Sequence, residues 1–335
     1  MSRITVMGSG AWGTAIALSL VKRGGHDLTL WSHSPEVAET ISERGENAVF
    51  LPGFPIPKDV RVTSNIEEAL RDAEIIVSVM PSHHVRASYQ QFAPFLRSGQ
   101  LLVSATKGIE DETLLRMSEV IVDVLKGFGL SLPVAVLSGP SFAQEVAAGS
   151  PAAITIASSD SEMAARVQRE FGSQSLRLYT NEDVVGVELG GALKNVIAIA
   201  AGIVSGLGLG HNSAAALITR GIAETTRLAV ACGGRSETLA GLSGIGDLVL
   251  TCTGSLSRNR TVGIELGKGR KLAEILADLH GKVAEGVRTT SAALGLARRH
   301  GVEMPITEQV AGILHENKSP REAMRELMSR PERDE

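Results

Sequence analysis

The sequence predicts an α/β fold in which an N-terminal doubly wound sheet is followed by an all-helical C-terminal domain. Three observations lead to this prediction. The first 181 residues alternate β-rich runs with helical stretches, several of these runs are apolar on both faces, and strand signals stop after Asn181. Strands that are apolar on both faces suit a parallel sheet covered by helices on each side. Alternation of strand and helix is typical of a doubly wound domain.

The N-terminal part supplies the elements in a regular order. The predicted strands cover residues 3–7, 27–31, 74–81, 101–108, 133–140, 152–158 and 176–181. The predicted helices cover residues 15–24, 34–45, 65–73 and 112–129, from their helical periodicity. Ser34, Ser64 and Asp111 are the candidate capping residues for the last three.

Beyond Asn181 the chain consists of long helical segments rich in Ala, Leu, Ile and Gly. We therefore predict two domains, residues 1–181 and 182–335. The last residues, "RPERDE", resemble a frayed charged tail.

Composition excludes several classes of function. Lys and Arg number 33 against 37 Asp and Glu, for a net charge of −4, so no general basic field attracts nucleic acid or an anionic membrane. Cys232 and Cys252 are too few for a disulfide framework and suit a reducing cytosol. The N-terminus lacks the pattern of a signal peptide. The longest apolar run, residues 196–210, is shorter than the ~20 residues that a membrane span needs. We expect a soluble, cytoplasmic protein without membrane insertion.

A glycine pattern near the N-terminus points to a dinucleotide. Gly8, Gly10 and Gly13 have the G-x-G-x-x-G spacing between a predicted strand and helix, and a second strand follows. Such glycines permit a tight turn, backbone approach to a pyrophosphate and close packing of helix on sheet. The alternative is an ordinary tight turn. The context favours a Rossmann-type, dinucleotide-binding domain at residues 1–181.

The end of the second strand bears on which dinucleotide binds. An NAD-specific site usually has Asp or Glu there, for the ribose 2′-hydroxyl. This chain has Ser32, His33 and Ser34 instead, and His33 is able to hydrogen-bond a 2′-phosphate. The sequence therefore predicts that NADP(H) is accepted, while the absence of an arginine leaves NAD(H) open as well.

Two segments of the C-terminal half contain candidate reactive groups. Lys194 interrupts an apolar stretch shortly after Gly190 and Gly191, although a buried ammonium is costly unless it is paired. We expect these glycines to leave space for substrate and nicotinamide to approach the helix beside Lys194. A snorkelling lysine over a glycine packing pair is the alternative. Farther on, Ser257 is a candidate N-cap in "SLSRNR", where free N–H groups and guanidinium side chains would form a compact phosphate site. A solvated basic turn with an ordinary cap is the alternative there.

Taken together, the two halves resemble the NAD(P)-dependent glycerol-3-phosphate dehydrogenases, particularly the bacterial type. The resemblance covers nearly the whole chain and is carried, in order, by "MGSGAWGTAIA", "LWSH", "ATKGIE", "SGPSFAQEVAAG", "VELGGALKNVIAIAAG", "ALITRG", "GIGDLVLTCT", "SRNR" and "VEMPITEQV". It implies reversible reduction of dihydroxyacetone phosphate to sn-glycerol 3-phosphate by NAD(P)H, which supplies glycerophospholipid synthesis. It also implies a homodimer.

The resemblance implies a role for individual residues. Lys194 is implied to be the catalytic proton donor and acceptor, and Asp247 or bound phosphate would compensate its positive charge. Lys107 is implied to reach both substrate and cofactor. The implied substrate-binding residues are Lys107, Gly139, Ser141, Lys194, Asp247, Ser257, Arg258 and Asn259. The implied cofactor-binding residues are Gly8, Gly10, Ala11, Trp12, Gly13, His33, Lys107, Ala143, Arg258, Val283 and Glu285. Ala11 departs from the pattern, because relatives often have Ser there.

Other interpretations of the same residues remain. Lys107 could be a surface lysine, Asp247 a helix cap and "SGPSF" only a turn. A related 3-hydroxyacid dehydrogenase and a catalytically silent NADP(H)-binding sensor are the alternative functions; "SRNR" argues against the first, and Lys194, Asp247 and Arg258 together argue against the second. The eight histidines include no metal-like pair, since the adjacent His83 and His84 cannot share a helix face, and hydride transfer to a carbonyl needs no metal.

Overall fold

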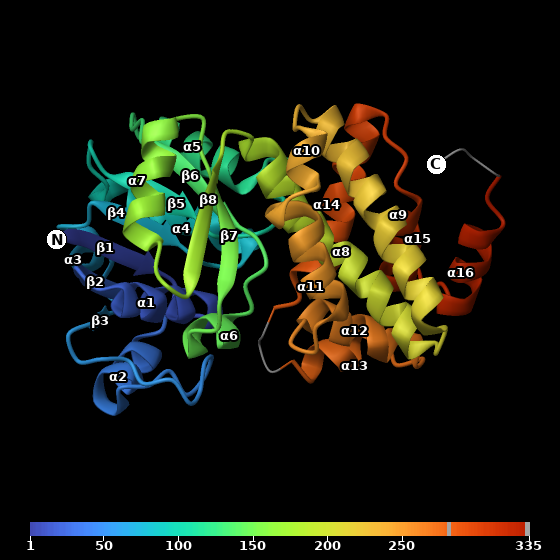
Figure 1. The fold of residues 1–335 in the computed structure, drawn as a ribbon, viewed down its shortest axis with the longest axis horizontal. Coiled ribbons are helices and arrows are strands. Elements are labelled where there is room, and N and C mark those ends of the chain that lie inside the picture. The colour runs from blue at the N-terminus through green and yellow to red at the C-terminus, as the bar shows by residue number, and fades with distance from the viewer. Residues whose placement is uncertain (280–282, 332–335) are drawn as a thin grey trace. The chain divides into compact units, whose positions relative to one another are not determined.

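The chain forms two compact units in the computed structural model, which describes residues 1–279 and 283–331. The first unit comprises Met1–Lys107 and Leu115–Val184, and the second comprises Gly108–Leu114 and Val185–Glu335 (Figure 1). The first unit thus ends three residues beyond Asn181, and the short segment 108–114 packs with the second unit rather than with its own sequence neighbours.

The described part of the first unit contains one sheet of eight strands in the order β3-β2-β1-β4-β5-β6-β7-β8. The strands are β1 (Ser2–Met7), β2 (His26–Trp31), β3 (Arg61–Thr63), β4 (Ile75–Ser78), β5 (Leu101–Ser104), β6 (Val134–Ser138), β7 (Ala152–Ala157) and β8 (Leu176–Asn181). All neighbours pair in parallel except β6 and β7, so the sheet is mostly parallel, as predicted. The short edge strand β3 was not predicted from the sequence.

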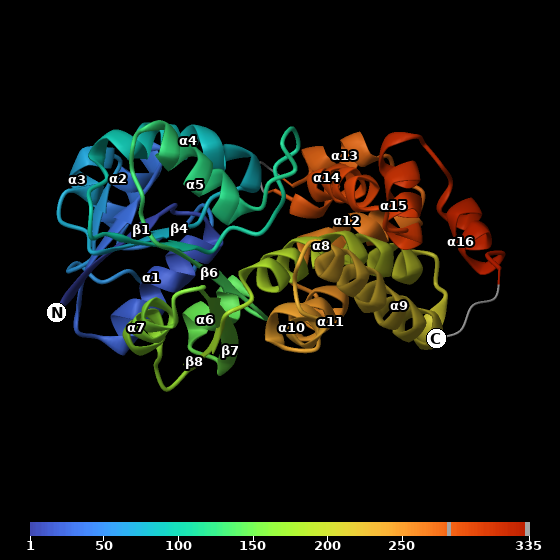
Figure 2. The ribbon, with the colours of Figure 1, turned by 90° about the horizontal axis from the view of Figure 1, so that it is seen from above.

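Helices cover both faces of this sheet. They are α1 (Ala11–Arg23), α2 (Pro35–Arg44), α3 (Ile66–Leu70), α4 (Val85–Phe92), α5 (Met117–Gly127), α6 (Ala143–Ala148) and α7 (Ser161–Phe171). In Figure 2, α4 and α5 lie on one side of the strands and α1, α6 and α7 on the other. Successive residues of β1 serve the two sides: Val6 packs in the apolar cluster under α1, and Met7 packs in the cluster under α4 and α5. This explains why the strands are apolar on both faces.

The predicted helix over residues 112–129 is wrong in its first part, because α5 begins only at Met117. Leu114 has a φ of 63°, a left-handed conformation that ends any helical path there, and its side chain packs against Gly295 in the second unit. Asp111 does not cap a helix; its carboxylate lies 3.5 Å from Arg288. Tertiary packing has therefore overruled the local helical periodicity. Of the other caps, Ser34 caps α2 as predicted, whereas Asn65 rather than Ser64 caps α3.

Helices are the main elements among the described residues of the second unit, although its segment 108–114 is not helical. Its helices are α8 (Val184–Gly206), α9 (Gly210–Ala231), α10 (Ser236–Leu239), α11 (Asp247–Thr253), α12 (Arg258–Gly267), α13 (Leu272–Ala277), α14 (Glu285–His300), α15 (Pro305–His315) and α16 (Pro320–Met328), with a π-helical turn at Leu242–Gly246. Among the described residues, α8 is the one unbroken helix long and apolar enough to cross a membrane, but its apolar window is entirely buried inside the protein.

Glycines let α8 and α12 approach until their backbones touch. A Cβ atom on Gly202 would lie 2.8 Å from the Cα of Gly263, and one on Gly206 would lie 3.0 Å from the Cα of Gly267. Distances this short leave no room for larger side chains on either helix. The glycines of the apolar segment therefore place the start of α12, with its "SRNR" sequence, beside the buried helix that carries Lys194.

Candidate active site

The three glycines of the N-terminal turn differ in their structural roles. Gly8 has a φ of 133°, and a Cβ there would lie 2.0 Å from the carbonyl oxygen of Val79. A Cβ on Gly13 would lie 1.8 Å from the carbonyl oxygen of Gly8. Gly10 differs, because a Cβ there would meet no atom within 4 Å. The fold itself requires Gly8 and Gly13, whereas Gly10 leaves open space above the turn.

This open space fits the pyrophosphate of a dinucleotide. Gly10 is the N-cap of α1 and supplies no side-chain cap, and the first turn of α1 carries no acidic residue. The first N–H groups of a helix have no partner within it and form a site for anions. Ala11 and Trp12 follow at the first two positions of the helix, and both are partly buried against the core.

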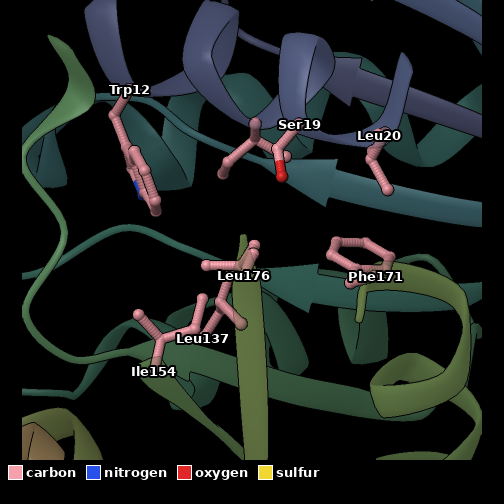
Figure 3. A pocket seen from close by; sticks show the side chains of 8 residues that line it. Trp12, Ser19, Leu20, Leu137, Ile154, Phe171 and Leu176 are labelled. Carbon is pink, nitrogen blue, oxygen red and sulfur yellow. The ribbon is translucent and has the colours of Figure 1, made fainter. Parts of the chain in front are cut away.

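Trp12 also lines a narrow apolar gap under α1, together with side chains from β6, β7, α7 and β8 (Figure 3). The lining residues are Trp12, Ile16, Ser19, Leu20, Leu137, Ile154, Phe171 and Leu176. The gap has no room for a water molecule, so it is a packing feature. The indole N–H of Trp12 is buried and has no hydrogen-bond partner in the structure, which is uncommon for tryptophan.

The three residues at the end of β2 differ in their exposure. Ser32 is buried, while His33 is exposed beside the Trp31 ring, with 6.0 Å between ring centroids. The Ser34 hydroxyl caps α2 by accepting from the Val37 N–H at 3.2 Å, and it donates to the Glu36 carboxylate at 2.5 Å. His33, which was predicted to contact the ribose or its 2′-phosphate, is thus the most exposed of the three.

Lys107, Gly139 and Ser141 come together just beyond the carboxyl ends of β5 and β6. The Lys107 ammonium donates to the Gly139 carbonyl at 3.0 Å, and the Ser141 hydroxyl donates to the same carbonyl at 2.9 Å. Gly139 has a φ of 131°, and a Cβ there would lie 3.0 Å from the Cα of Ile154, so no other residue fits without strain. Ala143 begins α6 shortly after this turn. Ligands of open α/β sheets bind at this edge, outside the carboxyl ends of the strands.

The second unit brings Lys194 and Asp247 into direct contact. The Lys194 ammonium donates to Asp247 Oδ1 and, at 3.0 Å, to the hydroxyl of Thr251. Asp247 is completely buried and Lys194 is only 8% exposed. Lys194 thus forms a buried ion pair rather than reaching out to solvent. Removal of either partner would leave the other buried with an uncompensated charge. Asp247 does not cap α11, although it is the first residue of that helix.

Gly190 has a structural role that differs from the expected one. We expected it to leave space for a ligand near Lys194, but a Cβ there would lie 2.4 Å from the carbonyl oxygen of Ser243. Gly190 therefore lets the π-helical turn approach α8. That turn leads directly into Asp247, so the close approach places the carboxylate beside the lysine.

A second group forms around the start of α12. Ser257 is its N-cap, as predicted, and accepts from the Arg260 N–H at 3.2 Å. The Asn259 amide donates to Asn195 at 2.9 Å and accepts from the Gly286 N–H at 3.0 Å. Asn259 thus links α8 to the start of α14, where Glu285 is the first residue and the partly buried Val283 lies just before it.

Arg258 adds a positive charge to the same helix end. Arg258 is exposed as a residue, yet desolvation of its guanidinium group lowers its pKa, and the nearby Glu285 carboxylate opposes that shift. A guanidinium group remains charged at any physiological pH. The free N–H groups of the helix and this cation together suit a phosphate group.

Thr251 and Asn195 belong to these groups, although the sequence did not single them out. Thr251 lies four residues after Asp247 and accepts from Lys194, which a helical spacing calculation could have suggested. Asn195 adjoins Lys194 and orients Asn259, 64 residues away, and no local signal predicts that pairing. In the described ranges, no three His, Cys, Asp or Glu side chains are grouped so as to hold a metal ion.

Comparisons with known proteins agree with this arrangement. The N-terminal and C-terminal models of NAD-dependent glycerol-3-phosphate dehydrogenase match residues 3–164 and 183–325. A relative from Acidobacterium capsulatum, named glycerol-3-phosphate dehydrogenase with the designation NAD(P)+, is 69% identical over the full length of both chains. A protein of the same name from Koribacter versatilis is 62% identical and covers 99% of this chain and 98% of its own.

A solved structure shares the whole fold. The crystal structure of glycerol-3-phosphate dehydrogenase from Coxiella burnetii superposes with a TM-score of 0.93 at 39% identity, covering 98% of this chain and 99% of the other. The matches to both family models, the full-length identity and the shared fold agree with one another. This chain belongs to the family of NAD-dependent glycerol-3-phosphate dehydrogenases.

Proposed function

We propose that this chain reversibly reduces dihydroxyacetone phosphate to sn-glycerol 3-phosphate with NAD(P)H and one proton, and so supplies glycerophospholipid synthesis. The observation that carries the proposal is the 69% identity, over the full length, to a glycerol-3-phosphate dehydrogenase that uses NAD(P)+. Residues 1–181 then bind the dinucleotide, and residues 182–335 contribute the acid–base and substrate residues.

The N-terminal unit holds the dinucleotide through backbone and side chains near the glycine turn. Gly8, Gly10, Ala11, Trp12 and Gly13 form the pyrophosphate site at the start of α1, which Gly10 leaves open. His33 is exposed and contacts the ribose or its 2′-phosphate. When bound, the reduced nicotinamide supplies the hydride. Ala143, Arg258, Val283 and Glu285 complete the contacts to the cofactor.

Lys194 supplies the proton. Addition of hydride to the carbonyl carbon places negative charge on the carbonyl oxygen, and an ammonium group at that oxygen stabilises and then protonates it. Asp247 and Thr251 hold the Lys194 ammonium by the two contacts described above. In the reverse direction, the neutral amine accepts the hydroxyl proton of glycerol 3-phosphate.

The phosphate of the substrate binds at the start of α12. Ser257, Arg258 and Asn259 supply a capping hydroxyl, a guanidinium group and an amide at a helix end with free N–H groups. Lys107, with Gly139 and Ser141, contributes a cation and polar groups at the edge of the sheet for the substrate. The Ser257, Arg258 and Asn259 group argues against a 3-hydroxyacid dehydrogenase, because a carboxylate substrate would not require this phosphate site. A silent NADP(H) sensor would have no use for a buried lysine–aspartate pair.

We further propose that the protein works as a homodimer in the cytoplasm, independently of nucleic acid and without membrane insertion. Its net charge of −4 and its two cysteines, which form no disulfide, support this setting.

The test is the loss of NADPH absorbance on addition of dihydroxyacetone phosphate, repeated with NADH and with unphosphorylated dihydroxyacetone. We expect turnover with both dinucleotides and at least a tenfold lower kcat/KM without the phosphate, since each charge-assisted contact contributes roughly 1.5–3 kcal/mol. Equal rates with the two ketones would contradict the phosphate site. No turnover with either dinucleotide would favour the sensor.

A further inference from the structure

Asn47 makes a set of buried contacts to the glycine turn that its position in the sequence does not suggest. It lies in the loop after α2 and is 1% exposed. Its side-chain amide donates to the Ser9 carbonyl at 2.6 Å and to the Thr14 hydroxyl at 2.8 Å. Ser9 lies between Gly8 and Gly10, and Thr14 is in the first turn of α1. Asn47 therefore binds the turn at both of its ends.

The loop that carries Asn47 is itself held in place. The Asn47 side-chain oxygen accepts from the Phe50 N–H at 3.2 Å, and its backbone carbonyl accepts from the Leu51 N–H at 2.9 Å. Leu51 is buried in the core cluster under α1. Farther along, the Ile56 N–H donates to the Gly45 carbonyl at 2.7 Å and closes the loop. Both donor hydrogens and the acceptor oxygen of the Asn47 amide are thus used, which fixes its orientation.

A second contact holds the same turn from Ser32, at the end of β2. The Ser9 hydroxyl donates to the Ser32 hydroxyl at 2.8 Å, and the Ser32 N–H donates to the Thr63 carbonyl at 2.9 Å. Asn47 holds the backbone carbonyl of Ser9, and Ser32 holds its side chain. Ser32 directly precedes His33, so its contact lies at the ribose end of the proposed site. The Asn47 contact acts on the pyrophosphate turn itself.

The geometry of the peptide bond converts the Asn47 contact into a statement about Gly10. The carbonyl of Ser9 and the N–H of Gly10 belong to one planar, trans peptide group, so they point in opposite directions. A donor that fixes the carbonyl also fixes the N–H. Gly10 would otherwise leave this peptide group freer to rotate, because glycine accepts a wide range of backbone angles. The Cβ side of Gly10 is open, as a pyrophosphate would require.

We propose that Asn47 is a positioning residue for the dinucleotide: it holds the Ser9–Gly10 peptide so that the Gly10 N–H faces the bound pyrophosphate. This inference rests on the proposed function, since it presumes that a dinucleotide binds at the turn. The pyrophosphate is common to NADH and NADPH. Loss of Asn47 therefore weakens both cofactors by the same factor, unlike a change at His33.

The experiment compares three variants with wild type, with cofactor binding measured in the absence of substrate and kcat measured with dihydroxyacetone phosphate. Asn47→Ala removes both donors, and Asn47→Asp keeps the shape but replaces the amide donor. Thr14→Val leaves the Asn47 contact to Ser9 in place but removes the acceptor of the other donor, together with the bond that the Thr14 hydroxyl donates to the Ser9 carbonyl at 3.3 Å. Asn65→Ala is the matched control, because Asn65 also serves a local backbone N–H, that of Glu68 at 3.1 Å, but caps α3. The dissociation constants of NADH and NADPH are measured by fluorescence, and hydrogen exchange reports on residues 8–14.

We expect Asn47→Ala to raise both dissociation constants by about tenfold, the equivalent of ~1.4 kcal/mol. Asn47→Asp should raise them at least as much, and Thr14→Val by roughly threefold, about half of that free energy. Exchange of amides 8–14 should accelerate, and kcat at saturating cofactor should stay within about twofold, as expected for loss of uniform binding. The Asn65→Ala protein should bind both cofactors as wild type does.

Two outcomes would overturn the inference alone. One is normal cofactor affinity in folded Asn47→Ala or, if that variant does not fold, in Thr14→Val. The other is a change for only one of the two dinucleotides. A wild-type protein that binds neither NADH nor NADPH would instead refute the proposed function, and the Asn47 inference with it.

Discussion

The two units assemble their candidate site residues in opposite ways. In the first unit, the groups are backbone atoms and short loops just beyond strand ends, such as the glycine turn after β1 and the turn at Gly139 after β6. In the second unit, they are side chains projected from separate helices, such as Lys194 on α8 and Asp247 on α11. The glycine turn is local in sequence, whereas the Lys194–Asp247 pair joins residues 53 positions apart.

This difference explains what each unit can tolerate. A backbone site depends on conformation, so the critical residues are those that permit a φ above zero or a close approach. A side-chain site in a helical core depends on pairing, because an ammonium or carboxylate that loses its partner there is left buried and charged. Changes in the first unit should therefore act on cofactor affinity, and changes in the second should act on turnover.

Lys194→Ala should give the largest effect. Loss of the proton donor should reduce turnover by roughly 10²–10⁴-fold while NADPH affinity stays near that of wild type. The change also leaves Asp247 buried without its partner, at a cost of about 3–5 kcal/mol in stability. The double variant Lys194→Met/Asp247→Asn should recover stability but not turnover. Turnover is followed by absorbance, NADPH affinity by fluorescence and stability by urea unfolding; near-normal turnover in folded Lys194→Ala would remove the lysine from the mechanism.

Arg258→Ala should come next. Loss of a charge-assisted contact to phosphate costs on the order of 1.5–3 kcal/mol, so kcat/KM for dihydroxyacetone phosphate should fall by roughly one to two decades. Arg258→Lys should restore only part of it, because a point charge cannot reproduce the planar fork of a guanidinium. Arg298→Ala, which changes an exposed arginine in the last turn of α14, is the control. Wild-type kinetics in Arg258→Ala would place the phosphate elsewhere.

A pair of glycine variants would separate cofactor binding from folding in the first unit. Gly10→Ala has room for its methyl group and an extended φ of −64°, so the protein should keep or gain stability. The methyl should still reduce dinucleotide affinity, by roughly tenfold if one backbone contact of ~1.4 kcal/mol is lost. Gly13→Ala should unfold at much lower denaturant, because its Cβ meets the Gly8 carbonyl. Normal NADPH affinity in Gly10→Ala would show that the open space is not the pyrophosphate site.

His33→Asp should have the smallest effect and act on cofactor choice alone. Wild type should use NADPH at least as well as NADH, since the exposed residue at the end of β2 is a histidine rather than a carboxylate. A carboxylate near the 2′-phosphate costs about 1 kcal/mol through solvent, or roughly five- to tenfold in the NADPH/NADH ratio of kcat/KM. His300→Asp, at an exposed position in the last turn of α14, is the control. An unchanged ratio in His33→Asp would mean that the ribose lies elsewhere.

The sequence by itself determined the features that depend on local pattern. Strands that are apolar on both faces predicted a mostly parallel sheet, and glycine spacing between a strand and a helix predicted the turn at Gly8. Ser34 and Ser257 were recognised as caps because a cap bonds to a backbone N–H only two or three residues away. Each of these patterns contains its own partner within a few residues, so no knowledge of the fold is needed to read it.

Tertiary structure alone decided which distant groups meet. The apolar composition of the segment indicated that α8 is buried, but the partner of Lys194 and the link from Asn195 to Asn259 required the packing of α8 against α11 and α12. Periodicity also predicted that a helix begins at residue 112. It begins only at Met117, because Leu114 packs against Gly295 in a conformation that is not helical. The physical reason is that a hydrophobic pattern specifies which face of an element is buried and not what covers it. The hold of Asn47 on the glycine turn belongs to this second kind, because it depends on where a loop folds back rather than on any motif.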